Sequence, residues 1–270
     1  MHLLKLEWLK LKKIRIFRVI VILYMVALPG LLLTVKTFNI EIDEMPPFLP
    51  TFDILFKFPT VWEWLAYVGN WLSFFFLGFL GVIMVTNEYS YKTLRQNIIT
   101  GLSRKEYYFS KVNFIFAASA VVTLYYILWC LIFGFIHTDT IYSNTILKNT
   151  SYIFRFFLLN LGYMSFGFLL GMLIKRTGIA LLIYVTYIMV IESILRGVHL
   201  YFFQNRSMHY FPMNALEDLC PFPFMEQAKD FTEENGFDLL LDPNEAILMS
   251  VIYISLYFLI SYRVMQKSDL

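Results

Sequence analysis

Residues 87–108 read NEYSYKTLRQNIITGLSRKEYY, and this polar stretch separates two long apolar segments. The segment before it, Leu65 to Thr86, and the segment after it, Val112 to Ile136, contain no charged residue. An α-helix rises about 1.5 Å per residue, so each segment can cross a hydrocarbon layer of about 30 Å. The polar stretch must then lie in water between two membrane-spanning helices.

The composition of the whole chain agrees with a membrane protein. Hydrophobic residues make up 59% of the sequence and charged residues 16%, whereas a soluble domain has about 25% charged residues. We therefore expect an all-α integral membrane protein that forms one transmembrane domain over residues 1–270. Six transmembrane helices are predicted, at about 16–35, 65–86, 112–136, 156–174, 179–195 and 246–262.

In the first residues, leucines recur about every three or four positions, as on one face of a helix, with lysines between them. Residues 1–15 are expected to form an amphipathic helix on an anionic membrane surface, with Trp8 at the level of the lipid headgroups. A signal peptide is the competing interpretation, because a basic start precedes an apolar segment. The long basic part and the lack of a small-residue cleavage site after Val35 favour an uncleaved first span.

The distribution of basic residues predicts the orientation in the membrane. With six spans, the face that holds both termini and residues 87–111 carries 15 of the 22 Lys and Arg residues. The opposite face includes the long acidic segment 196–245. The positive-inside rule then places both termini in the cytoplasm and residues 196–245 outside it, in a plasma (inner) membrane.

The polar stretch also has internal order. Thr93, Leu94 and Arg95 are typical of a helical turn, and Gly101 can end that helix. Ser103 can cap a new helix, with Glu106 three residues later as in a capping box. The expected result is a short helix, a break, and a helix that continues into the third span. A passive basic loop is the simpler interpretation.

This arrangement resembles the ABC-2 family of transporter permeases, in which the loop after the second span sits on a separate ATPase subunit. The resemblance implies a connector helix at the N-terminus and a coupling helix within the hairpin 87–111. It implies partnership with two ABC ATPase subunits, a second and identical permease copy, and export of a lipid, peptide or drug-like amphiphile. The residues expected to contact the ATPase are Glu88, Thr93, Leu94, Arg95, Gly101, Ser103, Arg104, Lys175 and Arg176.

The same resemblance places the second and fifth spans along the transport pathway. Aromatic residues on these spans are candidates for a gate, although lipid-facing packing is the simpler role for them: Phe75, Phe76, Phe79, Tyr184 and Tyr187. Gly167 and Gly171 form a small-residue motif at which another helix can approach closely. In this family, the segment before the last span often carries short re-entrant helices.

Several chemical activities find no support in the sequence. The chain has no Gly-x-x-x-x-Gly-Lys-Ser/Thr phosphate loop, so ATP and Mg²⁺ are expected on the partner ATPase, with no cofactor on this chain. No metal site, catalytic residue or nucleic-acid partner is predicted. Two alternatives stay open: an intramembrane enzyme, for which Glu192 is the candidate acid, and a membrane anchor of a larger ATPase-driven machine. For Glu192, a local ion pair with Arg196 is the simpler expectation.

Overall fold

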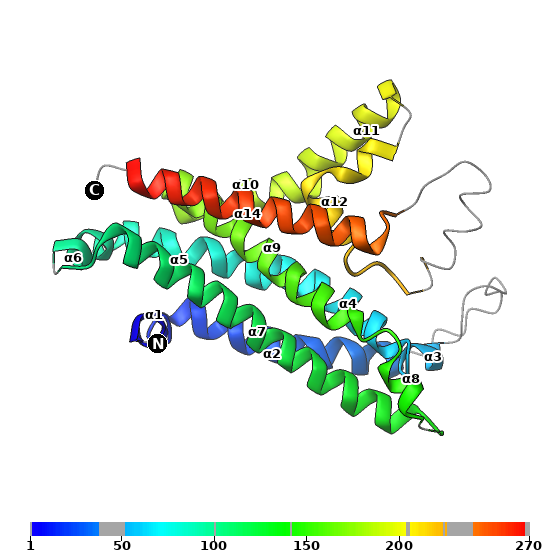
Figure 1. Ribbon diagram of the computed structural model, residues 1–270. Helices are drawn as coiled ribbons and strands as arrows, with labels where there is room; N and C mark the ends of the chain where they lie inside the picture. The colour runs from blue at the N-terminus through cyan, green and yellow to red at the C-terminus, as the bar shows by residue number, and fades with distance from the viewer. Residues whose placement is uncertain are drawn as a thin grey trace.

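The computed structural model is a bundle of long helices that run side by side (Figure 1). It describes residues 2–37, 52–99, 101–140, 142–203, 206–223, 225 and 240–267, and it contains no β-strand within these ranges. The first and last described helices begin and finish at the same end of the bundle (Figure 1). The chain must therefore cross the bundle an even number of times, which agrees with the six spans predicted from the sequence.

Six helices are long and apolar enough to span a membrane. Each predicted span lies inside one of them. The helices extend further than the predictions because their charged ends, such as Arg104 and Arg263, continue the helix beyond the apolar stretch. The six are α2 (Arg15–Thr37); α4 (Val61–Leu72) with α5 (Gly78–Ser90); α7 (Arg104–His137); α9 (Ser151–Ile174); α10 (Thr177–Thr186) with α11 (Glu192–Phe203); and α14 (Pro243–Lys267).

Two of the six helices contain a wider, π-helical segment. Ser73–Leu77 joins α4 to α5, and Tyr187–Ile191 joins α10 to α11. The second of these helices also continues to Phe203, past its predicted end at residue 195, because the residues after Arg196 are still largely apolar.

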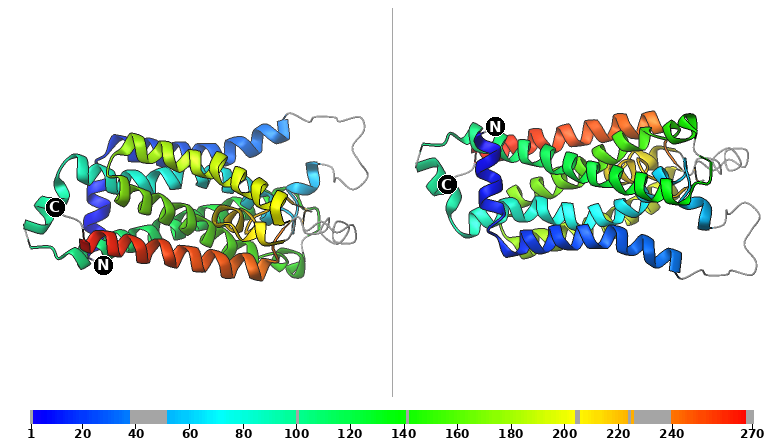
Figure 2. Two further views of the ribbon diagram at one scale, coloured as in Figure 1. Left: turned by 90° about the horizontal axis from the view of Figure 1, so that it is seen from above. Right: turned by 90° about the horizontal axis from the view of Figure 1, so that it is seen from below.

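Short helices lie at both ends of the bundle. Helix α1 (His2–Leu11) runs across one end, nearly perpendicular to the long helices (Figure 2). It covers most of the predicted amphipathic helix and ends before Lys12. Helix α6 (Thr93–Ile99) lies at the same end. The others are α3 (Phe52–Leu55), α8 (Ser143–Leu147), a 3₁₀ turn at Arg206–Tyr210 and α12 (Pro212–Glu217).

Parts of two predicted segments lie outside the described residues. The predicted loop between the first two spans is described only from residue 52 onward. The segment 196–245 is described except at 204–205, 224 and 226–239. In its described part, α12 packs against α14 and α9.

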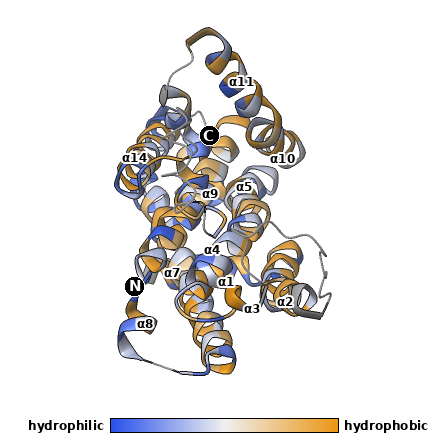
Figure 3. Cartoon of the chain, turned by 90° about the vertical axis from the view of Figure 1, so that its right-hand side faces the viewer, coloured by the Kyte–Doolittle hydropathy of each residue, from blue (hydrophilic) through white to orange (hydrophobic). Residues whose placement is uncertain are grey.

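Helix α9 is the centre of the bundle, with α5, α14, α7 and α10 packed around it. In their most apolar stretches, the helix that ends in α9 is 78% buried and the α4–α5 helix is 72% buried, against 22–28% for the other four. These four helices are rich in hydrophobic residues (Figure 3). Several of their apolar side chains are exposed, such as Val26, Leu124, Leu182 and Leu248. Such side chains suit contact with lipid chains.

Helices α5 and α9 approach so closely that their backbones touch. A Cβ atom added to Gly167 would lie 2.3 Å from the carbonyl oxygen of Gly78, and one added to Gly81 would lie 2.4 Å from that of Met164. At Gly171 the corresponding distance, to the carbonyl oxygen of Val82, is 3.0 Å. Small residues permit this approach where van der Waals contact, rather than exclusion of water, holds helices together.

We predict that Gly167→Ala destabilises the protein by about 1–3 kcal/mol, because the new methyl group forces α5 and α9 apart. Thermal unfolding in detergent measures the effect. Gly197→Ala, in α11, is the matched control, since a Cβ there meets no atom within 4 Å. Equal unfolding temperatures for the two variants would show that the α5–α9 contact does not limit stability.

Candidate functional site

The end of the bundle that carries α6 gathers most of the residues predicted to contact a partner. Helix α6 is followed by Gly101 at φ +108°, a left-handed conformation that glycine adopts without strain. Ser103 then caps α7: its Oγ accepts the Glu106 N–H at 3.2 Å, and its own N–H donates to Glu106 Oε2 at 2.9 Å. The predicted capping box is confirmed, and α6 and α7 are separate helices.

Helix α6 has one anchored face and one exposed face. Leu94 is buried, and the Thr93 hydroxyl donates to the Glu88 carbonyl oxygen at 3.5 Å. Arg95 is exposed, and Ile99, four residues later on the same face, is 75% exposed. A cation beside an exposed isoleucine makes this face suitable for contact with another protein. Ile99 was missed by the sequence analysis, although its spacing from Arg95 could have indicated it.

Two other predicted contact points have partners within the chain. The Arg104 guanidinium donates to the Gln266 carbonyl oxygen at 2.7 Å and to that of Met265 at 3.4 Å, so it binds the last turn of α14. Lys175 lies 5.2 Å from the centre of the Tyr89 ring, near the end of α5. Arg176, beside it, is exposed. The turn between α9 and α10 is therefore held against the helix that leads to α6.

A buried cluster of charges lies behind α6. The Lys111 side chain is fully buried, and its Nζ lies 2.5 Å from Glu7 Oε2 and 2.6 Å from Glu88 Oε1. Lys10 Nζ lies 3.3 Å from Glu7 and 3.7 Å from Glu88. The Ser110 hydroxyl also donates to Glu7, at 3.2 Å. We call Glu7, Lys10, Glu88 and Lys111 the Lys111 cluster.

The Lys111 cluster joins three helices, because its members come from α1, α5 and α7. Burial alone would raise the pKa of Glu7, but the ammonium groups of Lys111 and Lys10 outweigh it, so the pKa is lowered from its ordinary value of 4.5. The resulting stabilisation is present above pH 4.5 and is lost as the pH falls through the lowered pKa.

The sequence analysis singled out Glu88 but missed Glu7 and Lys111. Glu7 is the one acidic residue in the first forty, within a strongly basic helix, and that exception was the available signal. Its partner Lys111 lies far away in the sequence, so no local pattern could have connected the two residues.

The predicted gate residues divide into separate groups. Phe79 packs against both Phe75 and Tyr184, with ring centres 6.1 and 6.0 Å apart. The Tyr184 hydroxyl donates to the Phe74 carbonyl oxygen, at 2.9 Å, within the π-helical segment. The other two lie elsewhere: Phe76 contacts Tyr24 of α2, and Tyr187 contacts Phe166 of α9. Phe75, Phe79 and Tyr184 form one group of contacting rings, and Phe166 links this group to Tyr187.

Glu192 has a different partner from the one expected. Its Oε1 accepts the N–H groups of Met213 and Asn214, each at 2.8 Å, and it is buried beside the start of α12. Although both side chains are described, no ion pair forms between Glu192 and Arg196. The expectation of a local pair was wrong, because α12 folds back and supplies two backbone donors. Within the described ranges, no cluster of His, Cys, Asp and Glu could hold a metal ion.

We predict that Lys111→Met lowers stability by about 3–5 kcal/mol, because it leaves two buried carboxylates without their counter-ion. Lys105→Met, at an exposed position of the same helix, should change stability by less than about 0.5 kcal/mol. Thermal unfolding in detergent compares the two. If the Lys111 cluster holds the helices together, Glu88→Gln should also restore part of the loss when it is combined with Lys111→Met.

Comparison with known proteins agrees with this arrangement. A family model described as an ABC-2 family transporter protein matches residues 3–192, which include α1, α6, the Lys111 cluster and the first four long helices. No curated protein matches the chain. Because the family model covers more than half of the sequence, the chain belongs to the ABC-2 family and is a multi-pass membrane component of an ABC-2 type transporter.

Proposed function

We propose that this chain is the permease of an exporter driven by a separate ATPase, and that α6 is the element that docks on that ATPase. The observation that carries the proposal is the exposed Arg95–Ile99 face of a short helix whose other face is anchored to the bundle. Two ATPase copies would serve two permease copies, identical in the simplest assembly. ATP and Mg²⁺ would bind to the ATPase subunits.

The orientation proposed for the chain places the α6 end in the cytoplasm. The first helix begins and the last helix finishes at this end (Figure 1), which also holds most of the basic residues. Exposed examples are Lys5 of α1, Lys12 and Lys13 just after it, and Arg176 in the turn before α10. Cytoplasmic loops of membrane proteins carry an excess of lysine and arginine. An inner or plasma membrane is the corresponding location.

Movement of α6 would reach the membrane core through α5. Glu88, near the end of α5, is tied to α7 and α1 through Lys111, and the α5 backbone rests directly on α9. A displacement of α6 would therefore move a rigid unit instead of a single loop. Differential binding of ATP to two states of the partner would supply the energy for such a switch.

The proposed pathway runs beside the two π-helical segments. Phe75 and Phe79 lie on a surface backed by Tyr184, and Phe75 is 39% exposed. In a dimer of two permeases, the partner's copy of this surface would lie opposite and complete an aromatic gate. An amphiphile of lipid, peptide or drug-like character would suit such walls, and export is the direction that we propose.

We predict that the double variant Arg95→Ala, Ile99→Ser lowers the amount of co-purifying ATPase by about tenfold or more, since loss of a central contact costs about 2 kcal/mol or more. Affinity purification of the tagged chain in mild detergent, followed by an ATPase assay, measures this loss. The variant should unfold at the same temperature as the wild type, because both side chains are exposed.

The matched control is Leu147→Ser with Lys148→Ala, which removes one exposed apolar and one exposed basic side chain from the α8 region at the other end of the bundle. It should retain the ATPase. If the control loses the ATPase and the α6 variant keeps it, the partner binds the opposite end and the proposed orientation is reversed.

Reporter fusions give a direct check of the orientation. A fluorescent protein that matures only in the cytoplasm should be bright when fused after Leu270, whereas alkaline phosphatase there should be inactive. Alkaline phosphatase inserted near Asn144 should be active, because α8 lies at the end of the bundle opposite α6 (Figure 1). The reverse pattern of activities would place the termini outside.

A further inference from the structure

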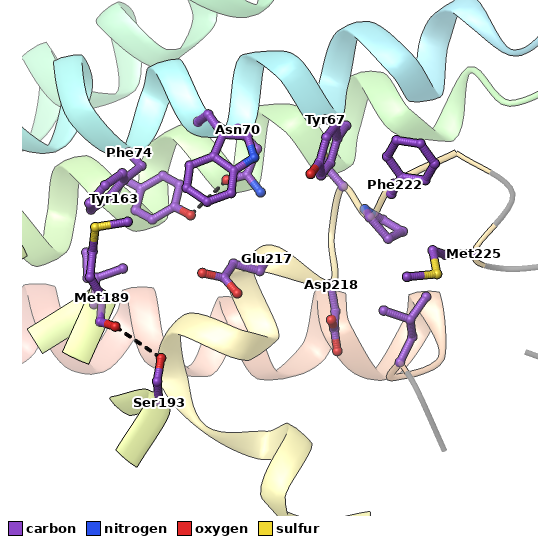
Figure 4. Close-up of a pocket in the computed structure, with 15 residues that line it drawn as sticks. Tyr67, Asn70, Phe74, Tyr163, Met189, Ser193, Glu217, Asp218, Phe222 and Met225 are labelled. Carbon is purple, nitrogen blue, oxygen red and sulfur yellow. Dashed lines mark hydrogen bonds between the residues drawn. The ribbon is translucent and has the colours of Figure 1, made fainter. Parts of the chain in front are cut away.

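A cavity of about 440 Å³ lies between α4, α9, the junction of the second π-helical segment with α11, and the polypeptide that follows α11. Aromatic rings form one wall, and the carboxylates of Glu217 and Asp218 lie across from them (Figure 4). This cavity lies apart from the α6 end and from the Lys111 cluster. None of the residues predicted as gate or docking residues lines it.

The two carboxylates have different roles. Asp218 is buried, and its Oδ2 accepts from the Asn214 side chain at 2.9 Å and from the Leu241 N–H at 3.0 Å, so it holds the segment in place. Glu217 is half-buried and points toward the opposite wall (Figure 4). Within the described part of the chain, no hydrogen bond reaches its carboxylate. Glu217 is thus the carboxylate available to a ligand.

A second, independent feature of the cavity is a buried amide with an unused donor. Asn70 is 7% exposed, and its Oδ1 accepts the Tyr163 hydroxyl at 2.8 Å. Its amide nitrogen has no acceptor among the described residues, and the side chain lines the cavity (Figure 4). Because Asn70 lines the cavity, a ligand that offers an acceptor oxygen there can accept a hydrogen bond from its amide nitrogen.

The aromatic wall has the chemistry that binds positive charge. The rings of Tyr67 and Phe222 are perpendicular, with centres 5.2 Å apart, and both line the cavity with Trp71. Trp71 is 49% exposed, so its ring has free surface. Faces of such rings attract organic cations, and a nearby carboxylate adds to this attraction.

We propose that this cavity binds an organic ammonium ion that carries an acceptor oxygen, such as an ester or amide carbonyl. Glu217 is the counter-ion, the ring faces surround the ammonium group, and the Asn70 amide donates to the carbonyl oxygen. An uncharged molecule of the same shape lacks the attraction to Glu217 and to the rings. Binding itself needs no ATPase, but the idea that the bound ion is the exported substrate rests on the proposed function.

The probe for this test is benzoylcholine, which has a quaternary ammonium, an ester carbonyl and a phenyl ring. Titration of the purified chain in detergent, followed by tryptophan fluorescence, should give saturable binding. Glu217→Gln should weaken it by about tenfold or more, because the quaternary ammonium has no N–H to donate and is attracted to the Glu217 carboxylate by charge alone, an attraction that the neutral amide lacks. Asp139→Asn, an exposed acid outside the cavity, is the matched control and should bind as the wild type does.

The uncharged isostere 3,3-dimethylbutyl benzoate separates charge recognition from partition into apolar space. Its binding should be the same in the wild type and in Glu217→Gln. Asn70→Leu should weaken benzoylcholine more than benzyltrimethylammonium, which has no carbonyl. The proposal is overturned if benzoylcholine does not saturate the wild type, or if Glu217→Gln binds it equally well while unfolding at the wild-type temperature.

The pH profile gives a further readout. Burial raises the pKa of Glu217 to about 7, with Arg196 opposing and Glu192 and Asp218 adding to the rise. Burial also raises the pKa of Asp218, to about 6. Because benzoylcholine keeps its charge, its affinity should increase as the pH rises from 6 to 8 and Glu217 ionises. A profile unchanged in Glu217→Gln would assign the titration to another group and count against the proposal.

These outcomes are distinct from those of the docking test. Loss of the ATPase in the Arg95→Ala, Ile99→Ser variant leaves benzoylcholine binding intact if both proposals hold. Saturable binding to a chain that never recruits an ATPase would support the cavity and overturn the transport function. If the chain recruits the ATPase but does not bind benzoylcholine, the transport function is supported and the cavity proposal is overturned.

Discussion

The ion pairs of Lys111 constrain the whole α6 end of the molecule. A lysine with no exposed surface is tolerated only where carboxylates surround it, and Glu7 and Glu88 must come from two other helices to do so. Helix α1 therefore has to lie across the bundle end, and the end of α5 has to stay beside α7. The free energy needed to separate these charges makes the three helices one mechanical unit. Helix α6 is attached to that unit by a short turn, so it is held rigidly with it.

Deeper in the bundle, side-chain hydrogen bonds replace ion pairs. The Ser73 hydroxyl donates to Asn160 at 2.6 Å, and the Tyr184 hydroxyl binds a backbone oxygen of the π-helical segment. Both contacts join separate long helices where no water is present to compete. Combined with the direct α5–α9 contact, they leave the outer helices as the less buried part of the bundle. The transport motion that we propose would then move this firm centre as one unit when α6 is displaced.

Much of the fold could be predicted because membrane helices follow simple rules. A largely apolar stretch predicted each long helix, and Ser103 with Glu106 predicted the start of α7. Long-range contacts were beyond such rules. Glu192 was expected to pair with Arg196 nearby, but it binds α12, because the fold brings together residues that no local pattern relates. The Glu7–Lys111 pair could not be predicted either, because its two residues are far apart in the sequence. The cavity at Glu217 could not be predicted because its walls come from four separate parts of the chain.

The crosswise position of α1 has a consequence for how the protein is made. Glu7 leaves the ribosome before Lys111, which follows only after two spans and the polar hairpin have been synthesised. Until then Glu7 of α1 lacks its partner Lys111. Helix α1 can therefore take its final position, with Glu7 paired to Lys111, only after the first three spans have assembled. A chain with misplaced early spans would keep α1 exposed, where proteases that remove faulty membrane proteins can reach it.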